Sequence, residues 1–153
     1  MTDSSSGSAT NILFDIWLVS RAATALLDSA LEPSGLTADE FAVYSVLRSG
    51  PLTPTELAEW MAAPLTTVSS YVKRFEARGH VRRMANPEDR RSYRLTLTAQ
   101  GVKAHERAGV QFLPALAAVE AALGRSESTV TRALEALRRA LAEVRSSPPL
   151  ATS

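Results

Sequence analysis

The sequence predicts a mainly α-helical protein with one small β-hairpin, and three observations carry this prediction. Apolar residues recur at helical spacing through most of the 153 residues. Two Thr-x-x-Glu motifs, at Thr37–Glu40 and Thr53–Glu56, are typical of capped helix starts. One stretch alternates instead, because polar residues separate Tyr93, Leu95 and Leu97 as in a half-buried strand.

Glycine and proline divide the helical pattern into segments. Helices are expected at about 11–31, 37–49, 53–61, 65–78, 98–123 and 126–145. In the third helix, Leu57, Trp60 and Met61 are expected to form the buried stripe. Pro114 lies inside the fifth helix, where a proline predicts a kink.

The third and fourth helices are short and separated only by a tight turn, which is the pattern of a helix-turn-helix. The next residues read as a hairpin, with HVRRM as the first strand, ANPED as the turn and RRSYRLTLT as the second strand. A hairpin in this position is a wing beside the second helix of the motif. We therefore expect a winged helix-turn-helix over about residues 36–98.

Composition excludes several classes of function. The chain has no cysteine, so it has no disulfide framework, thiolate metal site or catalytic cysteine. No secretory signal is visible, and no apolar run approaches the roughly 20 residues that span a bilayer. We expect a cytoplasmic protein with no membrane partner, folded as one domain over residues 11–145 between disordered tails at 1–10 and 146–153.

Basic residues are concentrated in one block. The formal net charge is +1, yet residues 71–97 hold eight basic side chains against three acidic ones. Such a block is the footprint of a face that binds a polyanion. A solvated arginine-rich surface is the alternative, and charge alone does not choose between the two.

The fourth helix combines an apolar face with a polar face suited to DNA. Val68, Val72 and Phe75 are expected to be buried. The opposite face and its flanks carry small hydroxyls and two long cations, at Thr66, Thr67, Ser69, Ser70, Lys73 and Arg74. Small hydroxyls let a helix approach base edges and phosphates closely, and the cations reach phosphates or guanine. An ordinary solvated helix face is the alternative.

The hairpin tip carries Asp89, Arg90 and Arg91. An arginine at a wing tip suits the minor groove, where negative potential is strongest over narrow A·T tracts. Asp89 is expected to hold an arginine extended through a charge-assisted hydrogen bond. A solvated tip is the alternative, but a hairpin directly after a basic helix face favours DNA.

These stretches resemble the MarR family of winged-helix transcriptional regulators. The resemblance covers about residues 35–101 and rests on LTADEFAVYSVL, GPLTPTELAEWMAAPLTTVSSYVKRFEARGHVRR and, most specifically, the wing NPEDRRSYRLTLTAQG. It implies a recognition helix at Leu65–Arg78, a wing tip at residues 89–91 and a homodimer built from the first and last helices. The sequence departs from the family pattern at Pro64, where a capping serine or threonine is common, and at His80, where a larger apolar residue is usual.

The terminal helices, at about 11–32 and 99–145, are expected to form the dimer interface. Ile12 and Ile16 supply apolar residues from the first helix. A heptad seam, which requires a partner helix, runs along the last helix at Val130, Leu134, Leu137, Leu141 and Val144. A two-fold pair would set its recognition helices about 34–36 Å apart, so a palindromic operator is expected.

The resemblance also implies a small aromatic or anionic effector. Trp17 and Arg21 lie one turn apart on the first helix and Tyr44 lies on the second, and an aromatic beside a cation suits a phenolic carboxylate. The alternative is that all three are core and rim side chains. A metal site is not expected, because His80 and His105 are the only histidines and no cluster shows ligand spacing.

The sequence thus predicts a sequence-specific double-stranded DNA-binding transcriptional regulator, acting as a homodimeric repressor. It shows no glycine-rich phosphate loop, nucleophile elbow or converging carboxylate pair, so neither an enzyme nor a cofactor is expected. Two alternatives remain, a winged-helix module for protein contact and a non-specific architectural DNA binder. Sequence preference and its dependence on salt discriminate among the three.

Overall fold

The computed structural model describes residues 11–146. The chain divides into two compact units, Met1–Ala115 and Leu116–Ser153, and each is described by itself. Both predicted tails lie outside the described residues, apart from Ser146, which is the last residue of a helix.

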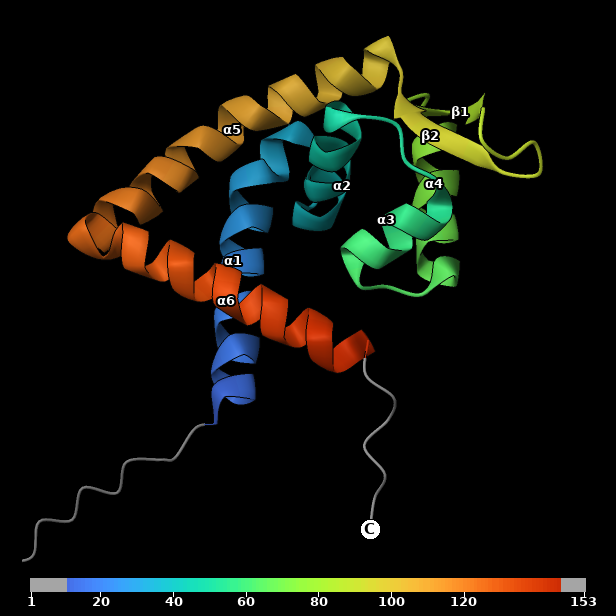
Figure 1. Ribbon diagram of the computed structural model, residues 1–153. Helices are drawn as coiled ribbons and strands as arrows, with labels where there is room; N and C mark the ends of the chain where they lie inside the picture. Colours follow the sequence, from blue (N-terminus) through green and yellow to red (C-terminus); the bar gives the residue numbers. More distant parts are fainter. Residues whose placement is uncertain (1–10, 147–153) are drawn as a thin grey trace, which may run out of the picture. The chain divides into compact units, whose positions relative to one another are not determined.

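The first unit contains six elements and a short 3-10 turn before its last helix begins. They are α1 (Ile12–Leu31), η1 (Glu32–Ser34), α2 (Ala38–Ser49), α3 (Pro54–Met61), α4 (Leu65–Ala77), β1 (Val81–Ala85), β2 (Tyr93–Leu97) and the start of α5 (Ala99–Leu123) (Figure 1). This order confirms the predicted mainly α-helical fold with one hairpin after a helix-turn-helix.

Local sequence signals account for the helix starts. The side chains of Thr37 and Thr53 each accept the N–H of the glutamate three residues on, and that glutamate's carboxylate accepts the threonine N–H. Pro54 lies in the first turn of α3, where its missing N–H has no cost. α4 begins differently, because Pro64 is its N-cap and no side chain caps its first turn.

The core of the first unit forms where α2, α3, α4 and the hairpin contact one another. All three residues predicted on the inner face of α4 are buried, namely Val68, Val72 and Phe75. The prediction for Trp60 was wrong, because its side chain is 52% exposed. α3 is a short helix that buries only a narrow strip through Leu57 and Ala58, and Trp60 lies outside that strip.

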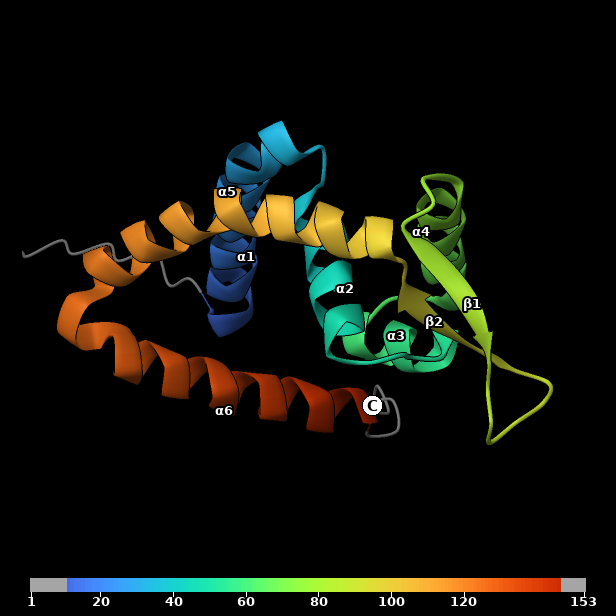
Figure 2. The same cartoon turned by 90° about the horizontal axis from the view of Figure 1, so that it is seen from above.

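The hairpin is an antiparallel pair of five-residue strands. Its connecting loop, residues 86–92, is longer than predicted, because Arg90 to Ser92 lie in the loop and not in the second strand. The N–H of Ser92 donates to the carbonyl oxygen of Asp89, which closes a turn there in place of strand pairing. The hairpin extends past α4, with the loop at its far end (Figure 2).

The start of α5 lies against the end of the helix-turn-helix. The hydroxyl of Thr98 donates to the carbonyl oxygen of Gly79 and accepts the N–H of Gly101. A Cβ on Gly101 would clash with the backbone carbonyl of His80, so glycine is required by this close approach. α5 continues as a helix through Pro114, and the kink expected there stays a prediction.

The second unit contains the rest of α5, the 3-10 turn η2 (Gly124–Ser126) and α6 (Glu127–Ser146). Gly124 has a left-handed backbone with φ +52°, which confirms the break predicted at this glycine. Along its described length, α6 has no buried residue. Leu134, in the middle of the predicted seam, is 46% exposed.

Candidate nucleic-acid interface

The outer face of α4 presents the predicted hydroxyls to solvent. Five of the predicted DNA-contacting side chains are exposed there, namely Thr66, Thr67, Ser69, Ser70 and Lys73. A shallow hollow of about 550 Å³ lies on this face, lined by Thr67, Ser70, Tyr71, Lys73 and Arg74. The helix therefore offers an open surface that combines hydroxyl groups with positive charge.

The hydroxyl of Ser70 is already used as a donor. Its Oγ donates to the carbonyl oxygen of Thr66 over 3.1 Å. The oxygen lone pairs remain able to accept a hydrogen bond from an incoming N–H group. In a major groove the amino groups of cytosine and adenine are such donors, so the geometry narrows what Ser70 can contact.

Arg74 differs from Lys73 because it is held from behind. Its Nη2 lies 3.8 Å from Oε1 of Glu40, and its guanidinium carbon lies 4.7 Å from the ring centroid of Tyr71. The Arg74 side chain is still 54% exposed. Its role as a DNA contact stays a prediction, with part of its charge balanced by Glu40.

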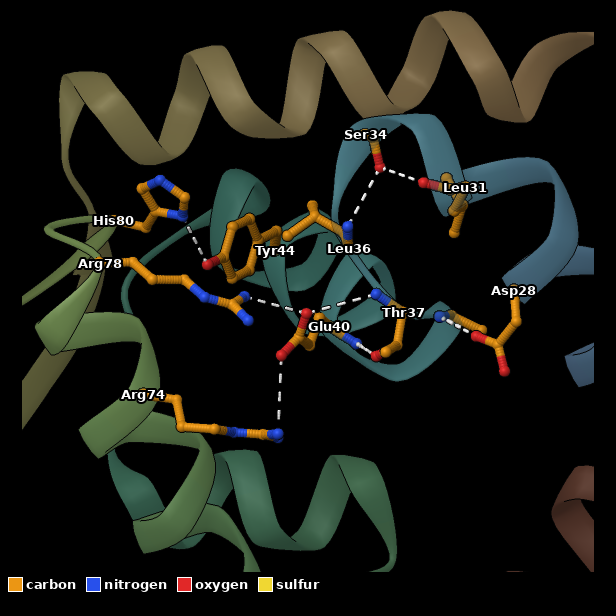
Figure 3. Close-up of polar contacts among 11 residues, drawn as sticks. Asp28, Leu31, Ser34, Leu36, Thr37, Glu40, Tyr44, Arg74, Arg78 and His80 are labelled. Atoms are coloured by element: carbon orange, nitrogen blue, oxygen red, sulfur yellow. Dashed lines mark hydrogen bonds and ion pairs between the residues drawn. The ribbon is translucent and has the colours of Figure 1, made fainter.

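From the sequence, Glu40 is recognisable only as a capping residue. In the structure its side chain is 2% exposed, and Oε2 accepts from Nη1 of Arg78 at 3.0 Å and from the N–H of Thr37 at 3.3 Å. Figure 3 shows Arg74 and Arg78 reaching from α4 toward this carboxylate on α2. Because a buried charge is stable only when it is paired, Glu40 ties α4 to α2.

Further polar contacts extend from Glu40 along α2 (Figure 3). Near the start of the helix, Oδ1 of Asp28 on α1 accepts the N–H of Ala38 at 2.7 Å. One turn beyond Glu40, the hydroxyl of Tyr44 shares a hydrogen bond of 2.9 Å with Nδ1 of His80. Burial raises the pKa of Tyr44 to about 12, which keeps the phenol neutral. The four-residue spacing of Glu40 and Tyr44 is the sequence signal that places both on one face.

The wing arginines are free of carboxylate partners. Arg90 and Arg91 are exposed in the loop, and no carboxylate of the described residues pairs with either guanidinium. The prediction for Asp89 was wrong in one respect, because its Oδ1 accepts the backbone N–H of Arg91 at 2.9 Å and not a guanidinium. A short carboxylate satisfies a neighbouring N–H most easily, so Asp89 shapes the loop backbone.

The other arginines of the basic block are mostly paired. Arg83 donates twice to Glu76, at 2.8 and 3.1 Å, and Arg94 lies 2.9 Å from Glu88. Four of the eight cations in residues 71–97 thus have carboxylate partners, namely Arg74, Arg78, Arg83 and Arg94. Four have none in the described part of the chain, namely Lys73, Arg82, Arg90 and Arg91. Arg82, exposed on β1, was missed as a candidate from the sequence.

The predicted effector site loses one of its three residues. Tyr44 is fully buried and its hydroxyl is bonded to His80, so it presents no surface to a ligand. Trp17 is 56% exposed and stacks on Phe14 at 5.8 Å between ring centroids. Arg21 is exposed on the same helix. Trp17 and Arg21 stay a prediction.

Both histidines have partners inside the fold. The ring of His105 stacks on Phe41 at 5.0 Å between centroids, and its Nε2 lies 3.0 Å from the hydroxyl of Ser45. Burial lowers the pKa of His80 and of His105. Among residues 11–146, no group of three or more metal-ligating side chains gathers, and no helix has the length and apolar character to cross a bilayer.

Comparison with known proteins decides the family. The MarR family profile matches residues 36–93. The multiple antibiotic resistance protein MarR of Salmonella typhimurium is 30% identical over 99 residues, which cover 61% of this chain and 69% of that protein. The chain belongs to the MarR family.

Solved structures of MarR-type regulators share this fold. The M. tuberculosis transcriptional regulator MOSR, solved in complex with DNA, is 30% identical, with 84% of this chain and 99% of that chain covered and a TM-score of 0.66. Wild-type apo MarR from E. coli is 25% identical, with 86% and 98% covered and a TM-score of 0.70. MarR-family proteins are DNA-binding transcriptional regulators and not enzymes, which confirms the class predicted from the sequence.

Proposed function

We propose that this MarR-family protein is a cytoplasmic transcriptional repressor that binds a palindromic DNA operator as a homodimer. The observation that carries the proposal is the combination of exposed hydroxyls and Lys73 on α4 with the unpaired Arg90 and Arg91 in the adjoining wing. α4 enters the major groove, and the loop of residues 86–92 reaches the flanking minor groove.

Uncovered apolar surface on both terminal helices supports the homodimer. On α1, Ile12 is 67% exposed and Ile16 is half-buried, and α6 buries none of its described seam. A large apolar surface left in water favours association, and a second copy supplies a matching seam. Leu137→Glu is expected to give monomers in sedimentation equilibrium, whereas Arg139→Glu, off the seam, leaves the dimer mass unchanged. A dimeric Leu137→Glu variant would refute this interface.

Selection of bound fragments from a genomic DNA library tests the operator. With competitor DNA at near-physiological salt, one enriched palindromic motif is expected, with half-sites about one helical turn apart. Weak binding without a motif that vanishes with salt would favour an architectural DNA binder. Absence of DNA binding would favour a module for protein contact.

The wing is tested with a matched pair of arginine variants. Arg91→Ala removes an unpaired cation and is expected to reduce the slope of log K against log salt by about 0.9. Arg83→Ala changes the net charge equally, but Arg83 is bonded to Glu76, so its loss should leave the slope unchanged. Equal slopes for Arg91→Ala and the wild type would remove the wing from the interface.

The recognition helix is tested by its effect on sequence preference. Thr66→Ala and Ser70→Ala are expected to change the selected motif, because neutral side chains add little to non-specific attraction. Lys73→Ala is expected to weaken binding to all sequences about equally. Identical motifs for all three variants would contradict base contact by α4.

We also propose that a small aromatic anion binds at Trp17 and Arg21 and releases the operator. The exposed indole and guanidinium, one turn apart on α1, support this site. In a Trp60→Phe background, a substituted benzoate is expected to quench the remaining tryptophan fluorescence and to dissociate the DNA complex. Loss of both effects in Arg21→Ala is expected, and unchanged quenching in that variant would exclude the site.

A further inference from the structure

The loop that carries the wing arginines is organised around one buried amide. Residues 87–91 of this loop are exposed, but Asn86 is only 7% exposed. The loop lies at the far end of the hairpin, beyond α4 (Figure 2). A buried amide is unfavourable unless it is hydrogen-bonded, so the partners of Asn86 indicate what its burial achieves.

Asn86 uses both ends of its amide to connect the loop. Its Nδ2 donates to Oγ of Ser92 at 2.7 Å, and its Oδ1 accepts the N–H of Glu88 and Nε of Arg94, both at 3.2 Å. Oγ of Ser92 donates in turn to the carbonyl oxygen of Asp89 at 3.3 Å. One side chain therefore joins the two ends of the loop, its first turn and β2.

The same contacts separate the cations of the wing. Arg94 is bonded to Asn86 and Glu88, and its side chain is 26% exposed. Arg90 and Arg91 have no carboxylate partner among the described residues and are exposed. The network thus retains one arginine as a structural member and leaves two available to a ligand.

We propose that Asn86 is a positioning residue of the wing. It holds the loop of residues 86–92 in one conformation before DNA arrives, so that Arg90 and Arg91 reach the minor groove without first being ordered. This inference rests on the DNA binding proposed above. Ordering one or two loop residues during binding would lower the affinity by a factor of about 5–30.

Two neutral variants test the inference without changing charge. Asn86→Ala is expected to weaken operator binding about 5–30-fold, and Ser92→Ala, which removes one of the bonds, less than that. The salt slope is expected to stay at the wild-type value for both, because the same phosphates are contacted in the complex. Arg91→Ala is the contrast, since it lowers the slope.

Hydrogen exchange in the free protein measures the loop directly. The N–H groups of Glu88, Arg91 and Ser92 are bonded within the loop and are expected to exchange faster in Asn86→Ala, while the midpoint of global unfolding stays the same. Asn86→Asp keeps an acceptor for the N–H of Glu88, so protection there is expected to be retained.

Each outcome decides the inference. Wild-type affinity of Asn86→Ala for the operator would overturn it, and so would a salt slope reduced as in Arg91→Ala. If the wild-type protein did not select any operator, the proposed function would fail, but hydrogen exchange would still decide the role of Asn86. Wild-type protection of the N–H groups of Glu88, Arg91 and Ser92 in Asn86→Ala would then overturn the inference by itself.

Discussion

Replacing Glu40 and each of its two arginines in turn separates the parts of the ion cluster that ties α4 to α2. Arg78 makes a hydrogen bond of 3.0 Å to the buried carboxylate, with its own side chain 39% exposed. Arg74 lies farther away, at 3.8 Å, and is 54% exposed. The geometry therefore ranks the three variants before any measurement.

Arg78→Ala is expected to lower the free energy of unfolding most, by about 3–5 kcal/mol, because it leaves a buried carboxylate without its main partner. Glu40→Gln is expected to cost about 1.5–3 kcal/mol, since both arginines regain water and the amide oxygen can still accept from Thr37. Arg74→Ala is expected to cost about 0–1 kcal/mol, as for a partly exposed ion pair.

Urea unfolding followed by helical circular dichroism measures these differences, at one protein concentration because a dimer's stability depends on it. The double variant Glu40→Gln/Arg78→Ala is expected to be no less stable than Arg78→Ala, since the orphaned buried charge is gone. A loss in Glu40→Gln larger than in Arg78→Ala would refute the reasoning. Equal losses in Arg74→Ala and Arg78→Ala would refute it as well.

Two further predictions concern α5 and the histidines. Gly101→Ala is expected to destabilise the protein by about 1–3 kcal/mol through its clash with the carbonyl of His80, whereas Gly109→Ala, which meets no atom within 4 Å, is expected to stabilise α5 by about 0.5–1 kcal/mol in thermal unfolding. Because burial lowers the pKa of His80 and His105 from 6.5, the unfolded chain binds more protons, so stability is complete above about pH 6.5 and falls as the pH drops toward the folded pKa values. His105→Gln is expected to flatten this decline between pH 7 and about 5, and an unchanged pH profile would contradict it.

Local features of the fold could be predicted because their causes lie within a few residues. The capping boxes at Thr37 and Thr53 each need only a glutamate three residues on, and both formed. The buried face of α4 follows from helical periodicity alone. Trp60 failed the same test, because in a helix as short as α3 the neighbouring elements decide which side is covered.

The candidate site was predictable in its position but not in its charge balance. Asp89 was expected to pair with a guanidinium, yet the nearest N–H, that of Arg91, satisfies it first. Glu40 and Arg78 lie 38 residues apart, so no local pattern announces their contact. Which arginines remain free is a property of the tertiary structure.

This partition limits how strongly salt can affect DNA binding through the basic block. In a homodimer, the four unpaired cations of each protomer supply eight at most, which corresponds to a slope of log K against log salt of about −7. If all eight cations of each block met phosphates, the slope would approach about −14. A measured slope near the larger value would mean that DNA displaces Glu40, Glu76 and Glu88 from their arginines. A slope no steeper than the smaller value is expected, because breaking the buried pair at Glu40 would cost more than one phosphate contact returns.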